Sequence, residues 1–144
     1  ALPFRQDKDG VHLLMVTSRT RKRWILPKGN LIKGLAPNKV AEVEALEEAG
    51  VVGSACSKAI GAYAYDHLNY DGSIRPSKVA VYPLLVTEQK DDWKEKDQRS
   101  IKWIPLKRAA KRADDEELSV LLEALAQSDA KALRRIANDL KKAG

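Results

Sequence analysis

The stretch that decides the fold is Gly29-Asn-Leu-Ile-Lys-Gly-Leu-Ala-Pro-Asn-Lys-Val-Ala-Glu42-Val-Glu44-Ala-Leu-Glu47-Glu48-Ala-Gly50-Val51, in which a basic loop leads into a short acidic segment. Pro37 suits the first turn of a helix and Gly50 suits its C-terminal end, so this stretch predicts a helix over roughly 37–49. One side of that helix is small and apolar, and we expect it to lie against a sheet. The residues on that side are Val40, Ala41, Ala45 and Ala49.

The other side of the predicted helix carries three carboxylates. Glu44, Glu47 and Glu48 are spaced i, i+3 and i+4, which places them within about a third of the helix circumference. Like charges at this spacing repel each other, and a hard divalent cation bound by carboxylate oxygens relieves that repulsion. On its own the spacing favours a solvated acidic helix face. When Gly29, Gly50 and the preceding Pro27-Lys28-Gly29 are included, a site for Mg2+ or Mn2+ becomes the favoured interpretation.

These residues resemble the Nudix box, G-x5-E-x7-R-E-U-x-E-E-x-G-U, where U is aliphatic. The matching residues are Gly29, Glu44, Glu47, Glu48, Gly50 and Val51. The preceding Trp24-Ile-Leu-Pro-Lys-Gly29 is similar to the strand and loop that lead into the box in the diphosphoinositol polyphosphate and dinucleoside polyphosphate branch. The resemblance is therefore to the bacterial phosphohydrolases of that branch.

Two positions depart from the box. Leu35 stands where the family has its first Glu, and Val43 stands where it has Arg. In the family these two side chains are thought to pair, so we interpret the change as an ion pair replaced by an apolar contact, a swap that is often neutral for stability. An arginine beside Glu44 and Glu48 would also have steadied both carboxylates. Their orientation is thus the open question.

The resemblance implies a fold, a reaction and a set of site residues. The implied fold is α+β, a Nudix-type α/β/α sandwich with a mixed sheet, the box helix and C-terminal helices. The implied reaction is hydrolysis of a pyrophosphate bond with Mg2+ or Mn2+ as cofactor. Glu44, Glu47 and Glu48 are the expected catalytic residues, and Gly29, through its carbonyl, is expected to bind the metal together with Glu44 and Glu48. Which glutamate acts as the base is left open.

Basic residues precede the acidic helix. The chain has a formal net charge of +6. Between Gly10 and Ala41 it carries seven lysine or arginine residues and no acidic residue. They are Arg19, Arg21, Lys22, Arg23, Lys28, Lys33 and Lys39. A basic rim beside a metal-seeking face suits a small-molecule polyphosphate, because cations bind its outer phosphates. The alternative is that Arg19 to Arg23 form a solvated turn.

Individual substrate-binding candidates come from the basic rim and from the resemblance. Lys78 lies where the inositol-pyrophosphate branch commonly has a cation that reaches the phosphates from a neighbouring strand. Arg5, Ser18, Arg19 and Lys28 are further candidates, with ordinary surface positions as the alternative. Aromatic side chains at Trp24, Tyr63 and Tyr65 suit either stacking on a base or, more commonly, packing in the core.

Length and composition predict one domain. The chain has 144 residues, 44% of them apolar, which is enough to bury a core. The sequence contains no long apolar run and no charged-then-apolar leader, so it predicts neither a membrane span nor secretion. The single cysteine, Cys56, fits a reducing cytoplasm. Because the chain opens on a strand-like Ala-Leu-Pro-Phe, we expect residues to precede it. The oligomeric state is left open.

Hydrophobic patterns predict the remaining elements. We expect strands over about 11–18, 23–26, 51–66, 77–87 and 101–104. A charged loop pinned by Trp93 is expected over about 88–100, and a helical C-terminal extension over about 106–144, with a helix starting near Ser128. The apolar side chains of that extension either close the core or form a partner surface. They are Leu118, Leu121, Leu122, Leu125, Leu133, Ile136 and Leu140.

A second class of function is a catalytically impaired Nudix-fold module. Leu35 and Val43 would then mark a decayed site that binds a nucleotide, an inositol polyphosphate or RNA through the basic rim. The three box glutamates argue against it, because a decayed site is expected to lose its metal ligands first. Nucleic-acid binding beyond RNA 5′ ends is not predicted, since no basic recognition helix is present.

Overall fold

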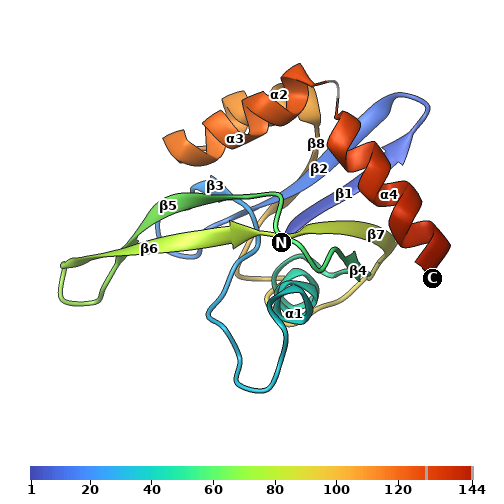
Figure 1. Ribbon diagram of the computed structural model, residues 1–144. Helices are drawn as coiled ribbons and strands as arrows, with labels where there is room; N and C mark the ends of the chain where they lie inside the picture. Colours follow the sequence, from blue (N-terminus) through green and yellow to red (C-terminus); the bar gives the residue numbers. More distant parts are fainter. Residues whose placement is uncertain (129, 144) are drawn as a thin grey trace.

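The computed structural model describes residues 1–128 and 130–143 and shows the α+β sandwich that the sequence predicts (Figure 1). The strands are β1 (Leu2–Asp7), β2 (Gly10–Thr17), β3 (Trp24–Ile25), β4 (Val51–Ala55), β5 (Gly61–Leu68), β6 (Ile74–Val81), β7 (Pro83–Gln89) and β8 (Ile101–Pro105). The helices are α1 (Pro37–Ala49), α2 (Leu106–Arg112), α3 (Glu116–Gln127) and α4 (Lys131–Ala143). Helix α1 lies on one side of the sheet, and α2, α3 and α4 lie on the other.

Strand β2 is the centre of the main sheet. The strand order is β3-β2-β1-β7-β4, with β8 also paired to β2. The β1–β7 pair is parallel, with Leu2 opposite Pro83, whereas the other pairs of this sheet are antiparallel. Strands β5 and β6 form a separate two-stranded sheet, which projects from the body in Figure 1. The sheet is therefore mixed, as predicted.

Alternate residues of β2 enter two different cores. Leu13 and Met15 belong to a core that is shared with α2, α3 and α4, which we call the α2–α4 core. Leu14 and Val16 belong to a core that contains the small face of α1, which we call the α1 core. This period of two is what a strand buried on both faces requires.

Helix α1 forms where the sequence predicts it. Pro37 occupies its first turn, and the backbone of Gly50 ends it in the left-handed region at φ 71°. Its Ala41, Ala45 and Ala49 are buried in the α1 core, and their small side chains let the helix axis lie close to the sheet. The predicted apolar face is thus confirmed.

Two predicted strands are each divided in two. The expected strand over 51–66 is β4 followed by β5, which lie in different sheets, and the chain bends between them from Cys56 to Ile60. The expected strand over 77–87 is likewise β6 and β7, which separate at Tyr82. The hydrophobic pattern does not mark either break, so it predicted one strand in each case, and both predictions were wrong.

The C-terminal extension consists of three helices that close the α2–α4 core. Leu133 is buried, and Ile136 and Leu140 pack against this core, so these side chains do not form a free surface stripe. Asp115 begins α3 by accepting a hydrogen bond from the Leu118 amide at 3.1 Å. The helix expected to start near Ser128 is α4, which begins at Lys131, whereas Ser128 itself ends α3. Residues 129 and 144 lie outside the described residues.

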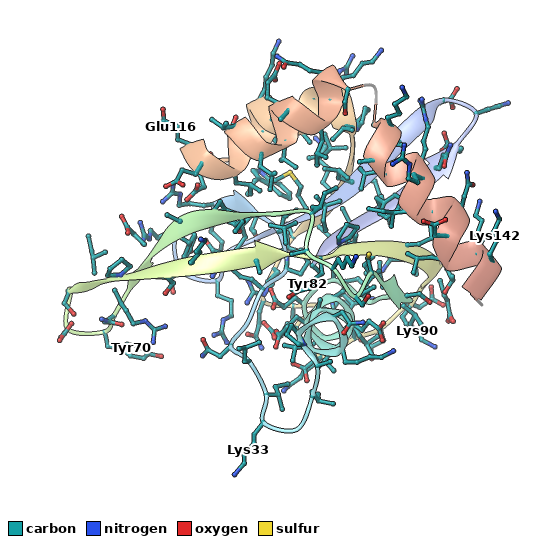
Figure 2. The ribbon with its side chains drawn as sticks, in the orientation of Figure 1. Lys33, Tyr70, Tyr82, Lys90, Glu116 and Lys142 are labelled. Atoms are coloured by element: carbon teal, nitrogen blue, oxygen red, sulfur yellow. The ribbon has the colours of Figure 1, made fainter. Side chains whose placement is uncertain are left out.

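Two segments extend away from the layers. Figure 2 shows Tyr70 at the tip of the β5–β6 hairpin and Lys33 at the tip of the loop that precedes α1. Leu31 and Leu35 of that loop are also exposed. Within the described part of the chain, no helix has the length and apolarity needed to cross a membrane.

The segment between β7 and β8 wraps around the end of α1. The Lys90 amide donates to the Gly50 carbonyl at 2.7 Å, and the Glu95 amide donates to the Glu47 carbonyl at 2.9 Å. The Trp93 ring lies directly on Gly50, where a Cβ atom would overlap it. Trp93 therefore pins this loop, as predicted.

We expect Gly50→Ala to destabilise the chain by about 3 kcal/mol, since it combines left-handed backbone strain with loss of the Trp93 contact. Gly34→Ala is the matched control, because Gly34 has φ 86° with nothing within 4 Å of a Cβ atom, and it should cost only about 1 kcal/mol. Thermal and denaturant unfolding measure both. Equal losses in the two variants would contradict the packing role of Trp93.

Candidate functional site

The centre of the site is the pair Glu44 and Glu48, one turn apart on α1. Glu48 is 2% exposed, and its Oε1 atom is buried without a hydrogen-bond partner. Burial, with a hydrogen bond between the two carboxyl groups, raises the pKa of Glu48 to about 8, although the nearby Arg99 opposes this. A buried carboxylate oxygen with no donor is unfavourable unless a cation binds it.

Gly29 contacts this pair from the loop before α1. A Cβ atom at Gly29 would overlap the Glu44 carboxyl group, so only glycine lets the loop backbone lie this close. The structure therefore brings together the three residues predicted to bind a metal, Gly29, Glu44 and Glu48.

Glu47 lies apart from this pair. Its carboxylate pairs with Lys94 at 3.6 Å and is about one third exposed. Among the described residues, no three acidic, histidine or cysteine side chains converge closely enough to hold a metal ion. Glu47 therefore does not join Glu44 and Glu48 in such a group, because its side chain faces the 88–100 loop, and its expected catalytic role stays a prediction.

Two charged residues of the 88–100 loop reach the site, and the sequence analysis missed both. Arg99 Nη2 lies 3.6 Å from Glu48 Oε1, and Arg99 Nε donates to Glu95 Oε1 at 2.9 Å. The Arg99 side chain is only 10% exposed and that of Glu95 is 13% exposed. The one available signal was the missing arginine at Val43, which left the glutamates without a cation.

Lys28 lies beside the carboxylate pair. Its Nζ atom is 3.8 Å from the centre of the Tyr65 ring, a cation–π contact. Burial lowers the pKa of Lys28, and the charges of Glu48, Arg99 and Arg75 also act on it. Lys28 therefore links the site to the β5–β6 hairpin.

The hairpin presents Arg75, and not Lys78, on the side of Tyr65. Tyr65 pairs with Ser77, whereas Lys78 pairs with Ala64, one residue out of step. Side chains of paired residues share a face, so Lys78 lies on the face opposite Tyr65, while Arg75 lies on its face. A phosphate-binding role for Lys78 stays a prediction that the strand register disfavours.

Arg5 lies far from the carboxylates. Its guanidinium stacks on the Trp103 ring at 4.5 Å, and Arg5 pairs with His12 on β2. Thr17, whose carbonyl accepts a hydrogen bond from Arg99, is five residues further along β2, roughly 16 Å away. The structure therefore does not bring Arg5 to the site.

Ser18 and Arg19 lie in the turn after β2. Ser18 closes this turn, since its Oγ accepts from the Arg23 amide at 2.9 Å. Arg21 donates to the Asp66 carbonyl and Lys22 donates to the Gln98 carbonyl, so these two cations link neighbouring segments. Arg19 is exposed at the tip of the turn.

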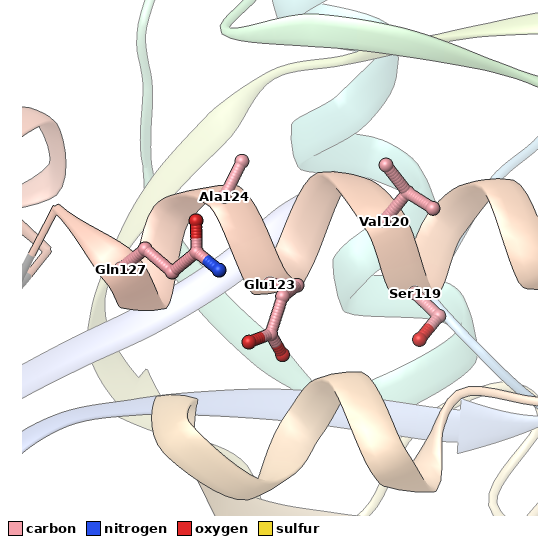
Figure 3. A pocket seen from close by; sticks show the side chains of 5 residues that line it. All are labelled: Ser119, Val120, Glu123, Ala124 and Gln127. Atoms are coloured by element: carbon pink, nitrogen blue, oxygen red, sulfur yellow. The ribbon is translucent and has the colours of Figure 1, made fainter.

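A pocket elsewhere does not match the predicted chemistry. It lies along α3 and is lined by Ser119, Val120, Glu123, Ala124 and Gln127 (Figure 3). Its charged side chain is acidic, which would repel a phosphate. This pocket therefore gives no reason to move the candidate site away from the carboxylate pair on α1.

Comparison with known proteins identifies the family. No protein-family model matches the chain. It is 31% identical over 121 residues to the mitochondrial Nudix hydrolase 16 of Arabidopsis thaliana, covering 75% of this chain and 67% of the relative. The chain belongs to the Nudix hydrolase family. It is also 35% identical over 94 residues to human diphosphoinositol polyphosphate phosphohydrolase 3-beta, covering 65% of this chain and 53% of that protein.

Solved structures show the same Nudix fold. A Caenorhabditis elegans Ap4A hydrolase in a binary complex aligns with a TM-score of 0.61 at 21% identity, covering 90% of this chain and 93% of that one. The Nudix domain of Shewanella oneidensis NrtR, complexed with ADP ribose, aligns with a TM-score of 0.61 at 16% identity, over 90% and 84% of the two chains. At these identities the likeness concerns the fold alone.

In this Nudix hydrolase the two departures from the box lie in different surroundings. Leu35 is 42% exposed on the loop before α1, and Val43 is half-buried on the helix. Any apolar contact between them leaves much of Leu35 in water. The brace that the usual ion pair supplies is therefore not replaced by a buried apolar pair.

The raised pKa of Glu48 predicts a pH-dependent stability. Its value of about 8 in the folded chain exceeds the ordinary 4.5, so between these values the folded state binds more protons than the unfolded state. The contribution of Glu48 to stability is therefore present below about pH 4.5 and is lost as the pH rises through 8. Glu48→Gln, which cannot ionise, should be more stable than the native chain at pH 8.5 by on the order of 2 kcal/mol, and only slightly at pH 5.

Thermal unfolding in chelator at the two pH values measures this difference. Glu42→Gln is the control on the same helix, because Glu42 accepts from the Ala55 amide and pairs with Lys39 at the surface. An equal gain for Glu48→Gln at pH 5 and pH 8.5 would contradict the buried, protonated carboxyl group.

Proposed function

We propose that this Nudix hydrolase cleaves a pyrophosphate bond in a highly charged substrate, a dinucleoside polyphosphate or a diphosphoinositol polyphosphate, with Mg2+ or Mn2+ as cofactor. The observation that carries this proposal is the pair of half-buried Glu44 and buried Glu48, with Gly29 against Glu44 and Lys28 beside them. The similarity to a diphosphoinositol polyphosphate phosphohydrolase and the shared fold with an Ap4A hydrolase support the substrate class.

The residues at the site fit a hard divalent cation. Carboxylate and carbonyl oxygens are the donors that Mg2+ and Mn2+ prefer, and Glu48 Oε1 is a buried oxygen without a hydrogen-bond donor. Glu44, Glu48 and the carbonyl of Gly29 would hold the ion. When bound, it would neutralise phosphate oxygens and lower the pKa of the attacking water.

The chain's own residues complete the reaction. Lys28 and Arg75 would bind phosphate oxygens on the hairpin side, and the exposed Arg19 would extend the basic rim. Glu47, whose carboxylate faces the 88–100 loop, is the candidate that takes the proton from the attacking water. Because Gly29 has no side chain, the loop backbone can lie close to Glu44.

A substrate panel tests the proposed reaction. Product release is measured from diadenosine tetraphosphate, diadenosine hexaphosphate, an inositol pyrophosphate, ADP-ribose and 8-oxo-dGTP, with Mg2+, Mn2+ or chelator. We expect turnover with metal only, favouring the first three compounds, and a loss of at least 100-fold in Glu48→Gln. Glu42→Gln should retain activity because its carboxylate bonds to β4 and not to the site.

The same panel distinguishes the impaired module. No turnover on any compound, with tight binding retained in chelator, would replace the hydrolase with a ligand-binding Nudix domain. Turnover that survives in Glu48→Gln would instead contradict the assigned metal site.

The strand register predicts which hairpin cation binds the substrate. We expect Arg75→Gln to raise KM about tenfold, because Arg75 lies on the face of Tyr65 and acts on Lys28. Lys78→Gln is the matched control on the same strand and should change KM less than twofold. Steady-state kinetics on the best substrate measure both, and the reverse order would restore Lys78 as the phosphate ligand.

A further inference from the structure

The buried Glu48 carboxylate faces one cation, Arg99, that does not come from the box. Glu48 Oε1 and Arg99 Nη2 are 3.6 Å apart, and the two side chains are 2% and 10% exposed. When a bound cation keeps Glu48 ionised, this contact is a buried ion pair, and removing one partner leaves the other charge without a partner. Glu48 therefore depends on a residue of the 88–100 loop.

Arg99 is itself held in place by two acceptors. Its Nη1 donates to the Thr17 carbonyl at 3.1 Å at the end of β2, and its Nε donates to Glu95 Oε1 at 2.9 Å. The next residue continues this attachment, since the Ser100 amide donates to Thr17 Oγ1 at 2.9 Å. The guanidinium is thus fixed between the central strand, the loop and α1, which suits its planar set of donors.

The box position that normally supplies an arginine cannot do so here. Val43 has no charge and no donor, and Leu35 offers no acceptor, so the usual pair is absent from both sides. Lys94 lies 3.6 Å from Glu47 and Lys28 lies over Tyr65, so each of these cations has another partner. Arg99 is the cation within ion-pair distance of Glu48 among the described residues.

We propose that Arg99 is a positioning residue that takes the place of the missing box arginine, and that it orients the Glu48 carboxylate for metal binding. Its role rests on the proposed function, since orientation matters where Glu48 binds a cation. Glu95 and Thr17 then act one step further out, by holding Arg99. The arginine that supports Glu48 thus comes from the loop after β7 and not from α1.

The test compares Arg99→Met with Lys90→Met. Lys90 lies in the same loop, is labelled in Figure 2, and pairs with Glu88 at the exposed surface, so its removal changes the net charge equally. Mn2+ dissociation constants are measured by electron paramagnetic resonance, and kcat and KM are measured at saturating Mn2+. We expect Arg99→Met to weaken Mn2+ binding about tenfold and to lower kcat at least tenfold, with KM changed less than twofold. Lys90→Met should match the native chain.

A rescue variant separates positioning from mere stabilisation. Val43→Arg in the Arg99→Met background returns an arginine to the box position, and we expect it to restore at least a third of the lost Mn2+ affinity. If Arg99→Met does not fold, as judged by circular dichroism, Arg99→Lys keeps the charge but not the three-way contact. It should bind Mn2+ several-fold more weakly than the native chain.

Three outcomes would overturn the role of Arg99. They are native Mn2+ affinity in the folded Arg99 variant, an effect on KM alone, and no recovery with Val43→Arg. Failure of the proposed function looks different, because the native chain would then bind Mn2+ but release no product from any substrate. In that case the Mn2+ titrations would still decide whether Arg99 orients Glu48.

Discussion

The burial of the Glu48 carboxylate is the constraint on which the rest of this structure depends. A carboxyl group that is 2% exposed is unfavourable when it is charged, so it requires either a bound proton or a nearby cation. The raised pKa of Glu48 favours the proton, and Arg99 supplies a cation. Helix α1 can place it there because alanines face the sheet and keep the helix close. Arg99 of the 88–100 loop, which donates to the Thr17 carbonyl at the end of β2, contacts Glu48.

The two hydrophobic cores lie on opposite faces of the sheet and contain different elements. The α2–α4 core is built from large aliphatic side chains and gives the sheet its support. The α1 core combines alanines, three of them on α1, with larger aliphatic side chains such as Leu14 and Val16, and so holds α1 against β2. Stability and chemistry therefore come from opposite faces of the same sheet, a division that permits sequence change on one face with little effect on the other.

Local signals explain what the sequence could predict. Pro37 and Gly50 fix the ends of α1 within its own segment, and the glutamate spacing fixes the acidic face. The break at Tyr82 and the choice between Arg75 and Lys78 depend on strand register, which the hydrophobic pattern of one strand does not reveal. The Arg99–Glu48 contact joins distant segments, so only tertiary structure discloses it.

The parallel pairing of β1 with β7 has a consequence for the order of folding. This pairing joins Leu2 to Pro83, so it forms only when the chain has closed a long loop. The contact of Arg99 with Glu48 also joins segments that are distant in the sequence, so we expect the site to be completed late in folding. A metal ion that needs the finished site would thus act mainly by slowing unfolding, and chelation would shorten the lifetime of the native state more than it delays its formation.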